Sequence, residues 1–157
     1  MNIFILSLLL ALPLYACAST NQTASTLYRV NHVYDGDTVL LTSLDHSTSI
    51  KFRILDIDAP EYDQAFGLQA TRALTRLCQN VWVKVILHGH DKYQRSLGHL
   101  YCRQQNVGLY LAQRGLAWRY WSSSNMDIKA AVDNAKRLKL GLWSQFQPVP
   151  PWLWRKR

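Results

Sequence analysis

Acidic residues of this 157-residue chain gather in two short segments. Five of its ten acidic residues lie there, namely Asp35, Asp37, Asp56, Asp58 and Glu61. A basic protein that brings carboxylates together is often building a site for a hard cation, which prefers oxygen ligands. Asp37 and Asp58 can supply two ligands, and a backbone carbonyl near Pro60 can supply a third. Each segment taken alone is more typical of an ordinary turn or strand end.

Two arginines add groups that bind phosphate. Arg53 lies on the polar face of an alternating segment that leads into Asp58 and Glu61. Arg95 follows a turn that contains Asp91. A guanidinium binds phosphate oxygens through two hydrogen bonds and keeps its charge at any working pH. A cation, a carboxylate base and two arginines are together the groups required for metal-assisted hydrolysis of a phosphodiester.

The segments that must position these residues have mostly strand patterns. Their β-branched and alternating residues, bounded by turn residues, predict five strands, with helices after the third and fifth. The expected strands cover 27–33, 38–42, 49–55, 81–87 and 97–102; the expected helices cover 64–79, 107–114 and a last segment between a cap at Ser124 or Asn125 and Gly141. Connections among the first three strands are too short for parallel crossovers. The sequence therefore predicts an α+β, mainly β fold, a five-stranded OB-fold barrel with three α-helices.

The charge of the chain favours a polyanionic partner. Lys and Arg number 18 against 10 Asp and Glu, for a formal net charge of +8, and such an excess is typical of nucleic-acid binding. Many small exported proteins are also basic without such a partner. The aromatic residues beside Arg119, including Tyr120 and Trp121, can stack on bases or pack against the barrel.

The N-terminal residues resemble an export signal. The apolar run at 3–12 has the length of a signal-peptide core and is shorter than the roughly 20 residues that span a bilayer. Cleavage after Ala18 and a lipobox that would give Cys17 a lipid anchor are both compatible with the sequence. We expect an exported protein that is secreted, periplasmic or envelope-attached. Its expected parts are a signal peptide at 1–18, a linker at 19–26, an OB-fold domain at 27–147 and a Pro- and Trp-rich basic tail at 148–157.

Two further cysteines lie inside the expected domain. An oxidising compartment would allow Cys78 and Cys102 to pair. Each lies in an apolar stretch, however, and small buried free cysteines are common. We therefore interpret both as buried free thiols.

Three motifs occur in an order that resembles the staphylococcal nuclease (thermonuclease) family. They are VYDGDTV at 33–39, FRILDIDAPE at 52–61 and DKYQR at 91–95, and the likeness extends over about 28–143. The resemblance implies a calcium-dependent endo- and exonuclease on a five-stranded barrel with three helices. Such an enzyme cuts DNA and RNA to leave 3′-phosphates. We expect a monomer that prefers single-stranded substrates and needs no protein partner.

The resemblance assigns the ligands of the calcium ion residue by residue. Asp37 and Asp58 match the carboxylates that bind Ca²⁺. Ala59 stands where the family usually has threonine, and alanine can serve because that position binds through its backbone carbonyl. Asp35 matches a residue that supports the site from just outside.

The resemblance also assigns the groups that act on the substrate. Glu61 matches the residue that activates or orients the attacking water, and Arg53 and Arg95 match the pair that grips the phosphate. The segment after Glu61 is shorter than in the type enzyme, and the tail at 148–157 has no part in the family's site. Residues implied to bind the substrate are Lys92, Tyr93, Tyr120 and Trp121.

Two other functions stay open at this point. The chain can be a catalytically weak or inactive barrel that binds nucleic acid, as some members of the family are, although its Glu61 and both arginines are intact. It can also be a lipid-anchored protein whose barrel binds a protein partner. Such binding would lack the steep salt dependence that phosphate contacts produce.

Overall fold

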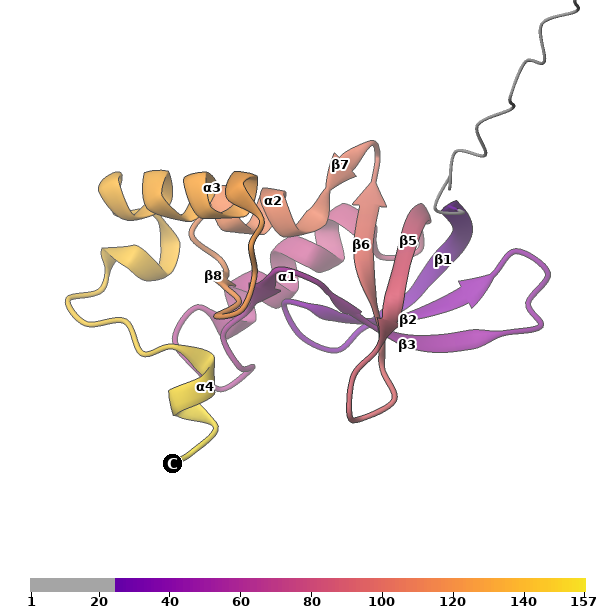
Figure 1. Ribbon diagram of the computed structural model, residues 1–157, viewed down its shortest axis with the longest axis horizontal. Helices are drawn as coiled ribbons and strands as arrows, with labels where there is room; N and C mark the ends of the chain where they lie inside the picture. The colour runs from indigo at the N-terminus through magenta and orange to yellow at the C-terminus, as the bar shows by residue number, and fades with distance from the viewer. Residues whose placement is uncertain (1–24) are drawn as a thin grey trace, which may run out of the picture.

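The computed structural model describes residues 25–157, whose arrangement Figure 1 shows. The predicted signal peptide at 1–18, with Cys17, lies outside the described residues, as does most of the predicted linker at 19–26. Strand β1 begins at Ser25, within the end of that linker. Among residues 25–157, no helix combines the length and the apolar character needed to cross a membrane.

Five strands form a closed barrel. They are β1 (Ser25–Val33), β2 (Thr38–Ser43), β3 (Ser49–Ile54), β5 (Trp82–His90) and β6 (Ser96–Cys102). Antiparallel pairs join β1 to β2 and β5, β2 to β3, and β5 to β6. Parallel pairing of β3 with β6 closes the ring. The predicted five-stranded barrel is confirmed, and its interior is filled by alternate residues such as Val30, Leu41, Phe52, Val85 and Leu100.

The three predicted helices lie together on one side of the barrel (Figure 1). They are α1 (Gly67–Cys78), α2 (Val107–Gln113) and α3 (Met126–Arg137). The side chain of Asn125, one of the two predicted caps, caps α3, and Leu138 just after the helix is 50% exposed. Shorter elements complete the described chain: β4 (Ile57–Asp58), β7 (Gln105–Asn106), β8 (Trp118–Arg119), the 3₁₀ helix η1 (Gly141–Ser144) and α4 (Pro151–Trp154).

Strand β3 directs Arg53 away from the core. Phe52 and Ile54 are buried in the barrel, so Arg53 between them lies on the other face of the strand, as the alternation predicts. The antiparallel register with β2 places Arg53 opposite Thr38, the residue after Asp37. Strand pairing therefore brings this arginine next to the first acidic segment.

The hairpin between β5 and β6 brings the second arginine to the same region. Strand β5 continues to His90, past its predicted end, with an irregularity between Leu87 and Gly89. The turn at 91–95 follows, and the parallel register places Ser96 opposite Phe52. Arg95 therefore lies beside the strand that carries Arg53.

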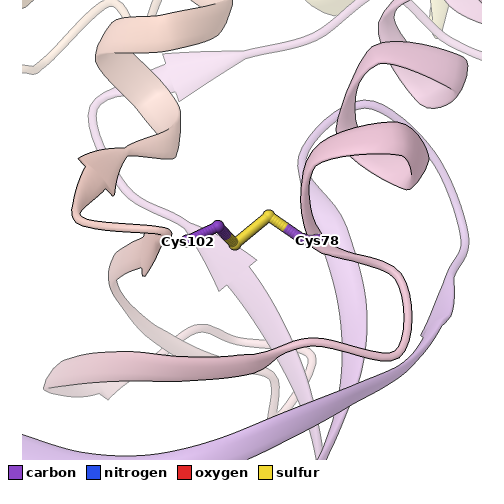
Figure 2. The surroundings of a disulfide bond; sticks show 2 residues. All are labelled: Cys78 and Cys102. Atoms are coloured by element: carbon purple, nitrogen blue, oxygen red, sulfur yellow. A yellow bond between two sulfur atoms is a disulfide. The ribbon is translucent and has the colours of Figure 1, made fainter.

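The two core cysteines form a disulfide, which Figure 2 shows. Cys78 is the last residue of α1 and Cys102 the last of β6, and their Cα atoms are 5.7 Å apart. Both side chains are fully buried. The prediction of burial is confirmed, but the interpretation as free thiols is wrong because the inward faces of the helix and the strand meet at these positions.

Candidate active site

A cleft of about 890 Å³ opens where the two acidic segments and the 91–95 turn meet. Most of the predicted site residues line it, namely Asp35, Asp37, Arg53, Ala59, Glu61, Lys92, Tyr93, Arg95 and Tyr120. Asp58 is fully buried and contacts the cleft through Arg53. Trp121 does not line the cleft and is 70% exposed. The structure thus brings together all the predicted site residues except Trp121.

The turn between β1 and β2 fixes Asp37. The Asp35 side chain accepts a hydrogen bond of 2.9 Å from the backbone nitrogen of Asp37. The Asp37 carboxylate is buried, where it accepts hydrogen bonds from the Thr38 hydroxyl (2.9 Å) and from the backbone nitrogen of Ala59 (2.8 Å). A Cβ at Gly36 would lie only 2.6 Å from the Ala59 Cβ, so only glycine lets the two acidic segments approach this closely.

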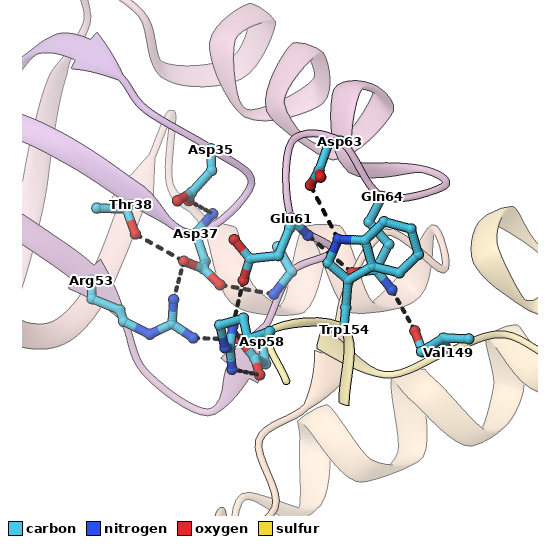
Figure 3. Close-up of polar contacts among 12 residues, drawn as sticks. Asp35, Asp37, Thr38, Arg53, Asp58, Glu61, Asp63, Gln64, Val149 and Trp154 are labelled. Carbon is cyan, nitrogen blue, oxygen red and sulfur yellow. Dashed lines mark hydrogen bonds and ion pairs between the residues drawn. The ribbon is translucent and has the colours of Figure 1, made fainter. Parts of the chain in front are cut away.

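Arg53 joins the two acidic segments, as Figure 3 shows. Its Nη1 donates to Asp37 Oδ1, and its Nη2 donates to Asp58 Oδ1 at 2.6 Å. Burial opposes the charge of Arg53, but Asp37 and Asp58 outweigh burial and raise the pKa of the guanidinium. Burial raises the pKa of Asp37 to about 7, and the nearby charge of Arg53 acts in the opposite direction. The cluster is therefore a buried charge network rather than a solvated surface.

The acceptor positions of this network fit a hard cation. A carboxylate has about four lone-pair positions. In Asp37 three of them accept hydrogen bonds from Arg53, Thr38 and the Ala59 nitrogen, which leaves one on Oδ2. In Asp58, contacts with two arginines likewise leave one on Oδ2. Within residues 25–157 no three His, Cys, Asp or Glu side chains gather to hold a metal, so the protein would supply two carboxylates and a backbone carbonyl.

The fifth acidic residue has a structural role. Asp56 accepts hydrogen bonds from the Ser123 hydroxyl (2.7 Å) and the Asn125 amide (2.9 Å). Asn125 is the cap of α3. The Asp56 carboxylate therefore links the strand end to the start of this helix.

The 91–95 turn presents a second cationic group. Asp91 accepts hydrogen bonds from the backbone nitrogens of Tyr93 (2.8 Å) and Arg95 (3.0 Å), and from Arg95 Nε at 2.7 Å. Burial alone would raise the pKa of Asp91, but these hydrogen bonds outweigh it and lower the pKa. Lys92 and Arg95 lie 5.0 and 5.6 Å from the Tyr93 ring. The turn thus holds two cations and one exposed aromatic ring at the edge of the cleft.

Glu61 lies on the loop that follows β4. Its backbone nitrogen donates to Gln64 Oε1 at 3.1 Å, and its carboxylate Oε1 accepts from Arg155 Nη1 at 2.5 Å. A Cβ at Gly67 would lie 1.7 Å from the Glu61 carbonyl oxygen, which shows how tightly this short loop folds back.

Arg155 is a member of the site that the sequence did not indicate. It lines the cleft and donates to Asp58 Oδ2 at 2.9 Å as well as to Glu61. Burial opposes its charge, but the hydrogen bonds to Asp58 and Glu61 outweigh burial and raise its pKa. The tail at 148–157, which has no part in the family's site, thus contributes a residue to the cleft of this chain. Its unusual content of Pro and Trp was the one sequence signal that the tail packs on the domain.

Comparison with known proteins agrees with this arrangement. A family model described as staphylococcal nuclease homologue matches residues 51–145. A Haemophilus influenzae protein named as an uncharacterized endonuclease is 36% identical over 158 aligned residues, which cover 99% of this chain and 86% of that protein. The micrococcal nuclease of Shigella flexneri is 34% identical over 139 residues, covering 81% and 79% of the two chains. The chain therefore belongs to the staphylococcal nuclease family, and it is an endonuclease of the micrococcal nuclease type that acts on nucleic acid.

Proposed function

We propose that this nuclease is calcium-dependent, hydrolyses the phosphodiester bonds of both DNA and RNA, and leaves 3′-phosphate ends. The observation that carries the proposal is the contact of Arg53 with both Asp37 and Asp58, in a cleft that Glu61 and Arg95 also line. This cluster combines oxygen acceptors for a cation, a candidate base and guanidinium groups for phosphate.

Asp37, Asp58 and the backbone carbonyl of Ala59 would hold the calcium ion. Asp35 supports this set because it fixes the backbone at Asp37. When bound, calcium would neutralise charge on the phosphate. The two carboxylates and Ala59 are buried, so they are held in position before any ion arrives.

Glu61 is the proposed general base. Its carboxylate takes a proton from a water molecule that attacks phosphorus in line with the 5′-oxygen. The bond between phosphorus and this oxygen breaks, the released 5′-oxygen takes up a proton from solvent water to become a hydroxyl, and the phosphate stays on the 3′ side. Arg53 and Arg95 stabilise the charge that develops on the phosphoryl oxygens. A guanidinium keeps its proton, so the role of both arginines is electrostatic.

The cleft edge supplies groups for the rest of the substrate. Lys92 and Tyr93 lie where a terminal phosphate could bind. Tyr120 lines the cleft, and the Trp121 ring lies 5.9 Å from the Tyr120 ring, so the pair can extend a stacking surface. Stacking needs unpaired bases, which favours single-stranded DNA and RNA. We propose that the enzyme acts as a monomer.

The proposal includes export. Residues 1–18 would be the signal peptide of a secreted, periplasmic or envelope-attached protein, in which a lipobox would attach a lipid to Cys17. The linker that follows would end where β1 begins, at Ser25. The disulfide between Cys78 and Cys102 supports an oxidising compartment. Calcium is also plentiful outside cells, where modules bind it with Kd values of about 10⁻⁴ to 10⁻³ M.

Digestion of single-stranded DNA by the chain without residues 1–18 tests this function. In millimolar calcium at alkaline pH we expect cleavage that a chelator abolishes and that Glu61→Gln reduces by about 10²- to 10⁴-fold. New 3′ ends should prime a polymerase only after phosphatase treatment. Near-normal activity of Glu61→Gln would remove Glu61 from its role. Salt-sensitive binding without cleavage would leave a nucleic-acid-binding barrel instead.

A further inference from the structure

The C-terminal segment 148–157 packs against the loop that carries Glu61. Gln64 Nε2 donates to the Val149 carbonyl at 2.5 Å, and Trp154 Nε1 donates to Asp63 at 3.1 Å (Figure 3). Pro151 is buried, and the Trp152 ring meets the Trp118 ring edge to face at 5.6 Å. These contacts hold the segment in place without any help from Arg155.

The contacts place the Arg155 guanidinium between two acidic residues of the site. Nη1 donates to Glu61 Oε1 at 2.5 Å, and Nη2 donates to Asp58 Oδ2 at 2.9 Å. Asp58 is fully buried and is itself held by Arg53. Arg155 therefore connects the flexible Glu61 side chain to a fixed point of the barrel.

The Glu61 carboxylate depends on this connection. Among residues 25–157, Arg155 is the only group that forms a hydrogen bond or ion pair with it. The Glu61 side chain is 32% exposed, so packing does not determine the direction of its carboxylate. Hydrogen bonds between ionised groups are about twice as strong as neutral ones, and only Oε1 is used, which leaves Oε2 for a water molecule.

We propose that Arg155 is a positioning residue for the nuclease reaction, which holds the Glu61 carboxylate in the direction required to take a proton from water. This inference rests on the proposed role of Glu61 as the general base. The tail thereby becomes part of the catalytic unit, and Arg155 acts through Glu61 rather than on the substrate. A loss of its contact should reduce kcat much more than it changes KM.

The test compares Arg155→Ala with the unaltered protein at saturating calcium. We expect kcat on single-stranded DNA to fall by about 10- to 100-fold, as misplaced catalytic groups do, with KM within about two-fold. Arg155→Lys should recover only part of the loss, because one ammonium cannot bridge two carboxylates as a planar guanidinium does. Millimolar guanidinium chloride should partly restore Arg155→Ala, whereas equal sodium chloride should not.

Arg157→Ala is the matched control. It removes the same charge from the same segment, but Arg157 lies against the Trp154 ring, 4.6 Å away, and not in the cleft. We expect its kcat to stay within about two-fold of the unaltered protein. Calorimetry should find calcium binding and cooperative thermal unfolding retained in Arg155→Ala, which excludes loss of the ion or of the fold as the cause.

Three results would overturn the inference. An unchanged kcat in Arg155→Ala would mean that Glu61 is oriented without Arg155. A higher kcat would make Arg155 a plug that blocks the site, and a change confined to KM would make it a substrate-binding residue. Failure of the proposed function looks different, since the unaltered protein itself would then show no cleavage that depends on calcium and Glu61.

Discussion

The two arginines that bind Asp58 are held in different ways. Arg53 comes from a barrel strand, contacts two buried carboxylates and has a side chain that is only 13% exposed. Arg155 comes from the C-terminal segment, and its side chain is 43% exposed. Strand register and core packing fix the first, whereas a few contacts of one short segment fix the second. Fold stability and site geometry are therefore inseparable at Arg53 and separable at Arg155.

Of the substitutions that test this comparison, Arg53→Ala should produce the largest effect, because Arg53 is built into the barrel. Removal of one partner from a buried ion pair costs about 3–5 kcal/mol, because Asp37 would remain buried without its counter-charge and Asp58 would keep only Arg155. Nuclease activity should also fall by about 10²- to 10³-fold or more, since a charge-stabilising donor is lost. Urea unfolding and initial rates measure the two losses.

Arg72→Ala, which removes an exposed arginine of α1, is the control for charge. It should leave the free energy of unfolding and the initial rate of cleavage nearly unchanged. An Arg53→Ala variant that is as stable as the unaltered protein would show that the network is not coupled to the fold.

Replacement of Cys78 and Cys102 by alanine should affect stability without affecting catalysis. The disulfide closes a loop with a sequence separation of 24 residues, and the chain-entropy argument for a loop of this size gives about 3 kcal/mol. The cross-link does not touch the cleft, so kcat at 25 °C should stay within about two-fold. Urea unfolding of the oxidised, reduced and double-alanine proteins measures the stability that the disulfide contributes. A loss of kcat in the double-alanine protein would show that the disulfide supports the active site as well as the stability of the fold.

Trp154→Phe should have the smallest effect, and it tests how the C-terminal segment holds Arg155 in place. It removes the hydrogen bond to Asp63 but keeps an aromatic ring, so the stability cost should be about 1 kcal/mol or less. We expect kcat to fall a few-fold because Arg155 is held less firmly. Asp63→Ala removes the other partner and should give the same loss, and the double variant should lose no more than either single variant. If the losses of kcat in the two single variants add up in the double variant, Trp154 and Asp63 do not act through the hydrogen bond between them.

The sequence predicted the parts of the site that depend on local patterns. Alternation in β3 placed Arg53 outside the core, and the strand end placed Asp58 and Glu61 next to it. Capping chemistry located the start of α3 at Ser124 or Asn125, and the structure uses Asn125. These features depend on neighbouring residues, so periodicity and turn chemistry are sufficient to find them.

Features that depend on remote contacts were not predictable in this way. Arg155 binds partners that are 94 and 97 positions away in the chain, and no local pattern encodes such a contact. The same holds for the disulfide, because apolar surroundings at Cys78 and Cys102 suit a free thiol and a half-cystine equally. Trp121 is a different case, since its ring lies outside the cleft and its proposed stacking role depends on its neighbour Tyr120.

The parallel pairing of β3 with β6 also determines when the enzyme becomes active. Phe52 and Ser96 meet only when the barrel closes, and contacts between such distant positions form slowly and late because a long loop must first be ordered. Arg53 and Arg95 therefore come together only when β3 and β6 have paired. For the proposed exported protein, a chain that is still unfolded inside the cell has no assembled active site. Such a chain cannot cleave the nucleic acid of its host.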